Sequence, residues 1–250
     1  MTRPLSRVVV ISTLVRSFLV QGSWNYHTML GLGFAFAMLP GLRRIFGADA
    51  DRLDAAVARH FEHFNAHPYL VTVALGAVLK LEADGTDPQV VRRFKLAVRG
   101  PLGSVGDTLV WATWLPGVAV LALALYWLGV PGWITAVFFL LTYNAGHVGL
   151  RVWGLRAGLR SGHDVARSLG AADLVGWARR MQPGVVLALG VLSGAVLGGE
   201  GGLADAGIPW SVLAMAGFLV GLIGGHRAWR PAAVAIVAAI GAIAGWGVIT

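Results

Sequence analysis

Five apolar stretches, each long enough to cross a membrane, constrain this sequence more than any other feature. They span residues 108–130, 131–150, 183–199, 208–225 and 231–249, and a helix needs about 17–25 residues to cross the hydrocarbon core. The chain is 56% hydrophobic and 13% charged, whereas soluble domains are about 45–50% apolar and about 25% charged. Because a water-soluble fold of this size cannot bury so much apolar surface, the sequence predicts an all-α polytopic membrane protein.

The charges predict how these spans are oriented. The net charge of +8 could indicate nucleic-acid binding, but the basic residues lie in short segments between apolar stretches, which is typical of cytoplasmic loops. The segment 151–182 contains six arginines and is predicted to be cytoplasmic, whereas the loop with Glu200 and Asp205 contains no Lys or Arg and is predicted to face outward. Alternation across the cytoplasmic membrane then places the N-terminus in the cytoplasm and the C-terminus outside.

The first hundred residues are predicted to form bent or re-entrant hairpins. Polar groups such as Arg16 and Asn25 interrupt residues 8–42 and are costly in contact with lipid, so we expect two helices with a sheltered polar corner. Residues 66–79 are apolar but too short for a span, and a re-entrant or interfacial hairpin would keep both flanks inside. We therefore predict a functional region at 1–107 for substrate and partner, and a transmembrane region at 108–250 with the basic linker 151–182.

The first motif whose side chains could bind a ligand is Gln21-Gly-Ser-Trp24-Asn25-Tyr-His27. Amide groups both donate and accept hydrogen bonds, and an indole covers the apolar C–H face of a pyranose, so Gln21, Trp24 and Asn25 are candidates for binding a sugar. The alternative is a hairpin corner whose amides cap broken helices.

The second motif, His60-Phe-Glu62-His63-Phe-Asn65-Ala-His67-Pro68, allows two interpretations. On one helix ending near residue 66, before Pro68, the three histidines would share a face suited to a metal. However, the spacing is not the H-E-x-x-H pattern, and the chain has no cysteine for a thiolate metal site. Polar capping near the membrane is therefore favoured, and we predict no metal and no cofactor.

The third motif is Gly100-Pro-Leu-Gly103-Ser-Val-Gly106-Asp107, directly before an apolar stretch. Three glycines and a proline predict a flexible or sharply bent connection, and Asp107 is either a functional carboxylate or the N-cap of the next helix. The phosphate-loop spacing is absent. Trp111 follows as a further candidate, and a fourth motif, Tyr143-Asn144-Ala-Gly-His147, is predicted to bridge neighbouring helices.

Together these motifs resemble the signature of the IID membrane component of mannose-family sugar phosphotransferase systems. The resemblance lies in Q-G-S-W-N-Y…G-L-G-F-A-F-A-M-L-P-G-L-R-R at 21–44, R-H-F-E-H-F-N-A-H-P-Y at 59–69, G-P-L-G-S-V-G-D-T-L-V-W-A-T at 100–113 and Y-N…G-L-R-V-W-G-L-R-A-G at 143–158. It covers residues 14–170 in the same order.

The resemblance implies a non-catalytic subunit that pairs with a IIC subunit in the cytoplasmic (inner) membrane and, with it, binds and translocates a hexose. A IIB protein then phosphorylates the sugar with a phosphoryl group received from IIA, so no catalytic residue is expected in this chain. The resemblance also favours Gln21, Trp24 and Asn25 as the sugar-binding residues. Glu62, Asn65, Asp107 and Trp111 are implied to shape the site or an interface.

The sequence departs from the family pattern at two places. Leu115-Pro116 stands where the family has an Arg-Pro pair, and His147 stands where it has an Arg. These changes leave a second hypothesis, a non-transporting regulatory or structural homologue that binds IIC.

Overall fold

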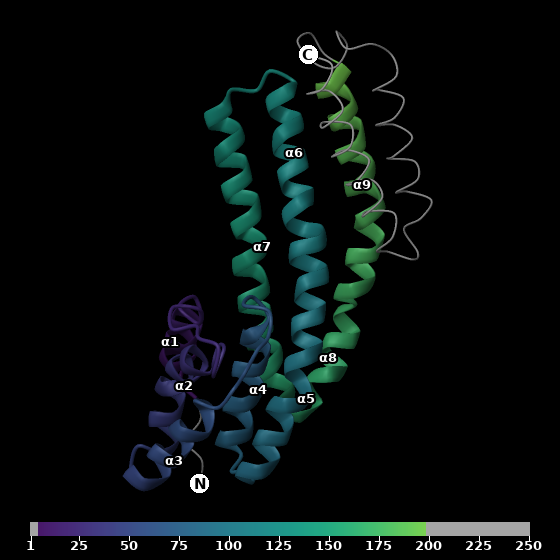
Figure 1. Cartoon of the computed structure of the whole chain (residues 1–250). Coiled ribbons are helices and arrows are strands. Elements are labelled where there is room, and N and C mark those ends of the chain that lie inside the picture. The colour runs from purple at the N-terminus through teal and green to yellow at the C-terminus, as the bar shows by residue number, and fades with distance from the viewer. Residues whose placement is uncertain (1–4, 199–250) are drawn as a thin grey trace. The chain divides into compact units, whose positions relative to one another are not determined.

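The computed structural model describes residues 5–198, and this part of the chain is built from helices (Figure 1). In chain order they are α1 (Arg7–Ser17), α2 (Gly31–Phe46), α3 (Ala50–His60), α4 (Val71–Ala83), α5 (Pro88–Gly106), a π-helix (Asp107–Trp114), α6 (Leu115–Trp127), α7 (Gly132–Ser161), a short 3₁₀-helix (Gly162–Asp164), α8 (Val165–Ala172) and α9 (Leu174–Gly198). The β-type contacts of these residues are isolated bridges, Asn25–Met29 and Met29–Phe64. The predicted all-α class is confirmed.

The chain divides into two compact units. Within the described residues, the first comprises 5–115 and Val137–Ala178, and the second comprises Pro116–Ala136 and 179–198. The first unit contains all four sequence motifs, so the candidate site is described within it.

Helix α4 lies in the core of the first unit and is enclosed by protein. Every residue from Val71 to Leu79 is buried, and α4 packs closely against α7. A Cβ atom at Gly76 would overlap the main-chain oxygen of Leu155, and one at Gly158 would overlap that of Val73. Glycine at these positions therefore allows the two backbones to touch, as it does between membrane helices.

Two continuous helical segments of the described part are long and apolar enough to cross a membrane, Pro88–Trp127 and Gly132–Leu192. Between them the chain reverses at Gly129, whose φ of 88° suits glycine, as the sequence predicts for residues 129–132. Large apolar side chains on α6 and α7 are exposed, among them Leu123, Trp127 and Leu141.

One expectation about these helices needs correction. Pro183 lies inside α9 instead of beginning a helix. The predicted linker 151–182 is helical, because α7 continues to Ser161 and α8 and α9 follow. The predicted spans 208–225 and 231–249 lie outside the described residues.

The predicted bend at residues 100–107 is also wrong. Helix α5 runs through Pro101 and continues without a break into the π-helix. Asp107 has helical φ and ψ of −61° and −44°, so it is not an N-cap. Its helix needs no cap there because the amides of this turn are bonded to the preceding residues of α5.

Candidate functional site

The loop between α1 and α2 is organised by the side chain of Asn25. Its Oδ1 accepts from the main-chain N–H groups of His27 at 3.0 Å and Thr28 at 2.9 Å. Its Nδ2 donates to the Ser23 carbonyl at 3.2 Å and to the Thr28 hydroxyl at 2.8 Å. An amide offers two donors and two acceptor positions, so this loop uses all four.

Two aromatic side chains of the same loop face outward. The Trp24 and Tyr26 rings meet edge-to-face, with centroids 4.8 Å apart, and are 46% and 82% exposed. Gln21 is also exposed. The loop thus presents an amide and two aromatic rings, while Asn25 holds its shape.

Main-chain hydrogen bonds join this loop to the 61–69 segment, which connects α3 to α4. The Leu30 N–H donates to the Phe64 carbonyl at 2.9 Å, and the Phe64 N–H donates to the Thr28 carbonyl at 3.1 Å. Met29 adopts a φ of 53° beside this bridge, and Phe64 is fully buried. The first and second sequence motifs are therefore parts of one structure.

Helix α5 holds the 61–69 segment from one side through a row of cations. Arg92, Lys95 and Arg99 are three and four residues apart, which places them on one helix face. Arg92 pairs with Glu62 at 2.7 Å, Lys95 donates to the Arg59 carbonyl at 2.8 Å, and Arg99 donates to the His63 Nδ1 at 3.0 Å. The end of α3 and the 61–69 segment are thus held at successive points along one helix.

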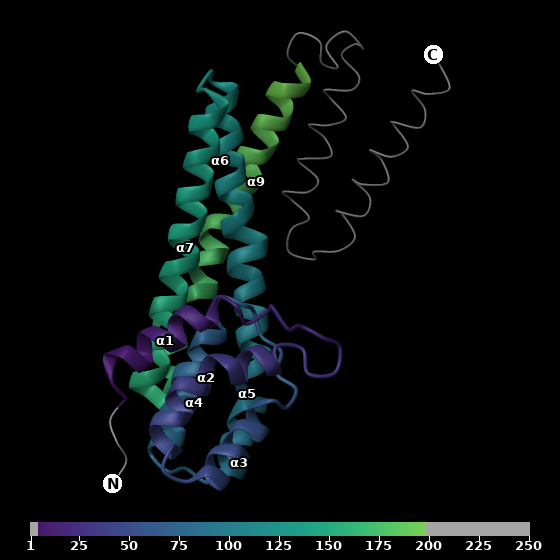
Figure 2. The same cartoon turned by 90° about the vertical axis from the view of Figure 1, so that its left-hand side faces the viewer.

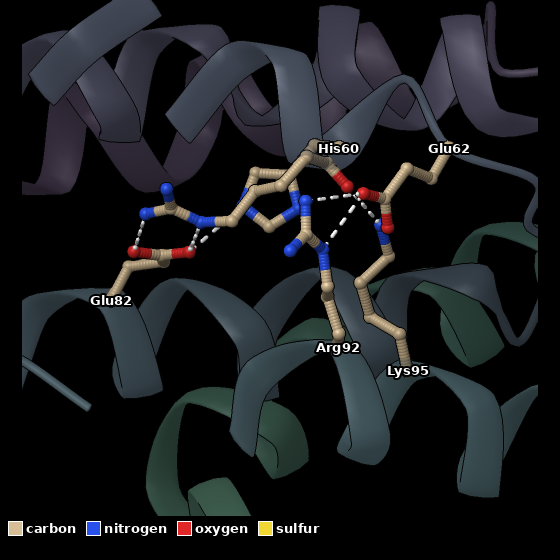
Figure 3. Close-up of polar contacts among 6 residues, drawn as sticks. His60, Glu62, Glu82, Arg92 and Lys95 are labelled. Carbon is tan, nitrogen blue, oxygen red and sulfur yellow. Dashed lines mark hydrogen bonds and ion pairs between the residues drawn. The ribbon is translucent and has the colours of Figure 1, made fainter. Parts of the chain in front are cut away.

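A buried carboxylate cluster, defined here as Arg59, His60, Glu82 and Lys95, shares Lys95 with this row. Figure 3 shows His60, Glu82 and Lys95 with their contacts. The Arg59 Nε and Nη2 donate to the two Glu82 oxygens at 2.7 and 2.6 Å, and His60 Nε2 lies 3.0 Å from Glu82 Oε1. The Lys95 ammonium also lies 5.4 Å from the centroid of the Phe34 ring. All four residues of the cluster are under 10% exposed.

Burial decides the charges within this cluster. It lowers the pKa of His60 from 6.5 to about 4, so His60 is neutral at pH 7 and its Nε2–H donates to Glu82. Burial alone would raise the pKa of Glu82, but hydrogen bonds from His60 and Arg59 outweigh it and lower that pKa. Glu82 is therefore an ionised carboxylate that fixes the end of α3, where the 61–69 segment begins.

The other end of the 61–69 segment meets the π-helix at His67. Gly106 packs directly on the imidazole, and a Cβ at this position would overlap the ring. The Trp111 ring lies 5.2 Å from the imidazole, centroid to centroid. The His67 Nδ1 accepts from the Tyr69 N–H at 3.2 Å, and its buried Nε2 has no protein partner among the described residues.

Arg151 of α7 ties the fourth motif to the beginning of the 18–30 loop. Its Nη1 donates to the main-chain oxygen of Ser17, the last residue of α1, at 2.6 Å, and its Nε donates to the His147 Nε2 at 2.7 Å. His147 stacks on Tyr69 with centroids 3.8 Å apart, and the Tyr69 hydroxyl lies 2.6 Å from that of Tyr143. A cation at a helix C-terminus is favoured by the helix dipole.

The predicted site residues thus lie on three neighbouring pieces of the first unit. Gln21, Trp24 and Asn25 are on the loop, Glu62 and Asn65 on the 61–69 segment, and Asp107 and Trp111 on the π-helix. The segment joins the loop at Phe64 and the π-helix at His67. The side chains of Asn65 and Asp107 are exposed.

The single helical face suggested for the three histidines is not formed. Helix α3 ends at His60, so His63 and His67 lie beyond it. Each has different surroundings: His60 bonds to Glu82, His63 to Arg99, and His67 packs on Trp111.

Sequence reasoning missed Glu82, Lys95, Tyr69 and Arg151 as parts of this arrangement. The spacing of Arg92, Lys95 and Arg99 is a helical signal that was available. Nothing local marks Glu82 or Arg151, because their partners are 23 and 134 residues away in the chain.

The chain is similar in sequence to proteins of a known family. The family model for the mannose/fructose/sorbose IID component of the phosphotransferase system (PTS) matches residues 4–195. The mannose-specific EIID component of Escherichia coli (strain K12) is 31% identical over 177 residues, which is 69% of this chain and 62% of that protein. The sorbose-specific EIID component of Klebsiella pneumoniae is 32% identical over 166 residues, covering 64% of this chain and 60% of the relative. The match thus spans about three fifths of the length of these relatives.

Two solved structures are similar in fold. One, described as a membrane protein, superimposes with a TM-score of 0.68 at 29% identity, covering 76% of this chain and 71% of the other. The other, the mannose transporter ManYZ in complex with microcin E492, superimposes with a TM-score of 0.60 at 24% identity over 98% of this chain and 97% of that chain. With the apolar helices, these similarities identify a membrane protein, and the chain belongs to the mannose/fructose/sorbose family of PTS IID components.

Proposed function

We propose that this chain forms, with a IIC subunit, the membrane part of a mannose-type sugar permease that binds and translocates a hexose. A IIB protein would phosphorylate the sugar with a phosphoryl group received from IIA, and this chain would take no part in the chemical step. The observation that carries the proposal is the exposed amide and aromatic surface of the 18–30 loop, held by hydrogen bonds to a second family motif.

The chemistry of the loop suits a sugar. An exposed indole such as that of Trp24 offers an apolar face, and the Gln21 amide can donate to and accept from hydroxyl groups. Asn25 completes the proposed site. Because its four hydrogen bonds lie within the loop, we propose that it keeps the neighbouring side chains in place for the sugar. Glu62, Asn65, Asp107 and Trp111 would line the site or contact IIC.

The direct test is hexose binding by the purified IIC–IID complex carrying Trp24→Ala. We expect at least about a tenfold loss of affinity, which corresponds to about 1.4 kcal/mol. Trp177→Ala is the matched control, because Trp177 is 58% exposed on α9 and lies outside the loop. An intact complex that binds and takes up hexoses equally well with Ala at position 24 would contradict the proposed site.

The departures from the family pattern favour a second candidate, a IID homologue that binds IIC without transport. Leu115 and His147 stand where the family has arginine, and in this chain His147 is an acceptor for Arg151. A complex that stays assembled but binds none of a panel of hexoses would favour this alternative.

The proposed function includes a topology in the cytoplasmic membrane. We propose five spans in the region 108–250, a re-entrant or interfacial placement of residues 66–79, an N-terminus in the cytoplasm and a C-terminus outside. Residues 1–107 would carry substrate and partner contacts, with the basic segment 151–182 on the cytoplasmic side. The clustering of arginine in that segment supports this orientation.

A further inference from the structure

Helix α1 carries an apolar stripe that the first unit leaves uncovered. Val8, Ile11 and Val15 are three and four residues apart, which places them on one helix face. They are 75%, 59% and 61% exposed. The helix also contains Thr13 and Ser17, which are fully buried. One side of α1 therefore packs against protein, and the other side is exposed.

The length of α1 excludes a membrane crossing by this helix. It has 11 residues, and at about 1.5 Å per residue it is about 16 Å long, whereas the hydrocarbon core is about 30 Å thick. Its apolar stripe therefore needs a different position in the membrane.

The direction of α1 indicates that position. Within the first unit α1 runs across α7 and not along it. Figure 1 shows α1 nearly end-on beside the upright α7, and Figure 2, turned by 90°, shows α1 from the side. Because α7 is apolar and long enough to cross a membrane, a helix that lies across it runs along the membrane plane.

The depth of α1 follows from its contact with α7. Arg151 bonds to Ser17 and lies nineteen residues after Gly132, where α7 begins. That interval is about 28 Å of helix, close to the thickness of the hydrocarbon core. Trp133, which is 72% exposed, marks the first edge, because exposed tryptophans favour the membrane interface. Arg151 and the end of α1 then lie at the second edge.

From this geometry we infer that α1 is an interfacial helix, with Val8, Ile11 and Val15 among the lipid acyl chains and Arg7 at the level of the phosphate headgroups. Amphipathic helices of this kind bury their apolar face about 5–10 Å into the boundary between headgroups and acyl chains. Arg7 is exposed at the beginning of the helix, where it can pair with anionic lipid. The inference depends on α7 crossing the membrane, and not on sugar transport.

Single-cysteine labelling tests the inference, because the chain contains no cysteine. The full chain carrying Ile11→Cys would be spin-labelled in vesicles of phosphatidylethanolamine and phosphatidylglycerol. Collisions with lipid-soluble oxygen and with a water-soluble nickel chelate would then be compared. Leu140→Cys on α7, at a residue 55% exposed, is the reference for the bilayer interior, and Ala58→Cys, at an exposed position of α3, is the aqueous reference.

We expect the label at position 11 to have a several-fold higher ratio of oxygen to nickel collisions than the label at position 58, at a depth shallower than that of position 140. A ratio equal to that of position 58 would overturn the inference, because lipid would not cover the stripe. So would protection from both probes, because protein would then cover it. Nickel access to position 140 would refute the premise about α7, while hexose binding by the complex tests the proposed function separately.

Discussion

Helices α4 and α7 are both apolar, yet one is buried in protein and the other is exposed. From Val71 to Leu79 every residue of α4 is buried in protein, whereas α7 exposes Trp133, Leu140 and Leu141. Composition does not separate the two helices. Length does, because the 13 residues of α4 are too few to span the hydrocarbon core and the 30 residues of α7 are enough.

The two helices also differ in how they tolerate polar groups. Helix α4 carries Glu82, which is 2% exposed and needs Arg59 and His60 as partners. Arg151 lies where the apolar stretch of α7 ends, and its N–H groups donate to neutral acceptors: the His147 ring nitrogen and the Ser17 carbonyl at the C-terminus of α1. A short buried helix thus anchors the site by an ion pair, and a long exposed helix anchors it by a cap. The two kinds of anchor should respond differently to substitution.

Glu82→Gln should give the largest effect. It leaves the Arg59 guanidinium buried without a countercharge, which typically costs about 3–5 kcal/mol. The free energy of unfolding in detergent micelles measures it. Asp84→Asn is the control, because its pair with Lys80 on the same helix is 38% and 51% exposed and should be worth less than about 1 kcal/mol. Equal losses for both variants would refute the assigned role of the buried pair.

Truncation of leucine compares the two surroundings directly. Leu75 on α4 is fully buried, so Leu75→Ala should cost about 3 kcal/mol through lost contacts and the cavity left behind. Leu140→Ala on α7 removes an exposed side chain and should cost less than about 1 kcal/mol. The unfolding midpoints of the two variants in micelles measure the difference, and a larger loss at position 140 would mean that protein covers that face.

The glycine contact between the two helices should show an intermediate effect. In Gly158→Ala the added methyl group would overlap the Val73 carbonyl oxygen of α4, and overpacking of this kind costs about 1–3 kcal/mol. Gly149→Ala on the same helix is the matched control, since a Cβ there meets nothing within 4 Å. Thermal unfolding of both variants decides whether α4 and α7 touch at these residues, because a stable Gly158→Ala variant would exclude the close approach.

His60→Gln should have the smallest effect at pH 7, where His60 is neutral and a Gln amide can also donate to Glu82. Below pH 6.5 the unfolded histidine binds a proton, but the folded one, with a pKa of about 4, does not. Wild-type stability therefore falls as the pH drops from 6.5 to about 4, and the loss continues as Glu82, with its lowered pKa, is protonated.

The measurement is the unfolding midpoint of His60→Gln and wild type across that pH range. The variant should lose less stability between pH 6.5 and 4, while His27→Gln, at an exposed position, should follow the wild type. An unchanged acid sensitivity of His60→Gln would show that another group controls it.

Local patterns predicted some of the site and missed the rest for identifiable reasons. The all-helical class and the turn at Gly129 follow from hydropathy and from glycine, which act over short distances. The bend at Gly100–Asp107 was wrongly predicted, because helix packing on His67 overrides the low helix propensity of glycine and proline. The start of α9 was misplaced for the same reason, because the helix runs through Pro183. Helix α3, in contrast, ends at His60, well before Pro68.

The sequence by itself determined that this chain is an all-helical membrane protein of the IID family, because hydrophobicity, charge and motif order are written along the chain. Only the tertiary structure decided that Asn25 shapes its own loop, that Glu82 is buried against Arg59 and His60 at the end of α3, and that Arg151 caps α1. Those roles depend on which distant residues supply hydrogen bonds and countercharges, and burial makes such partners obligatory.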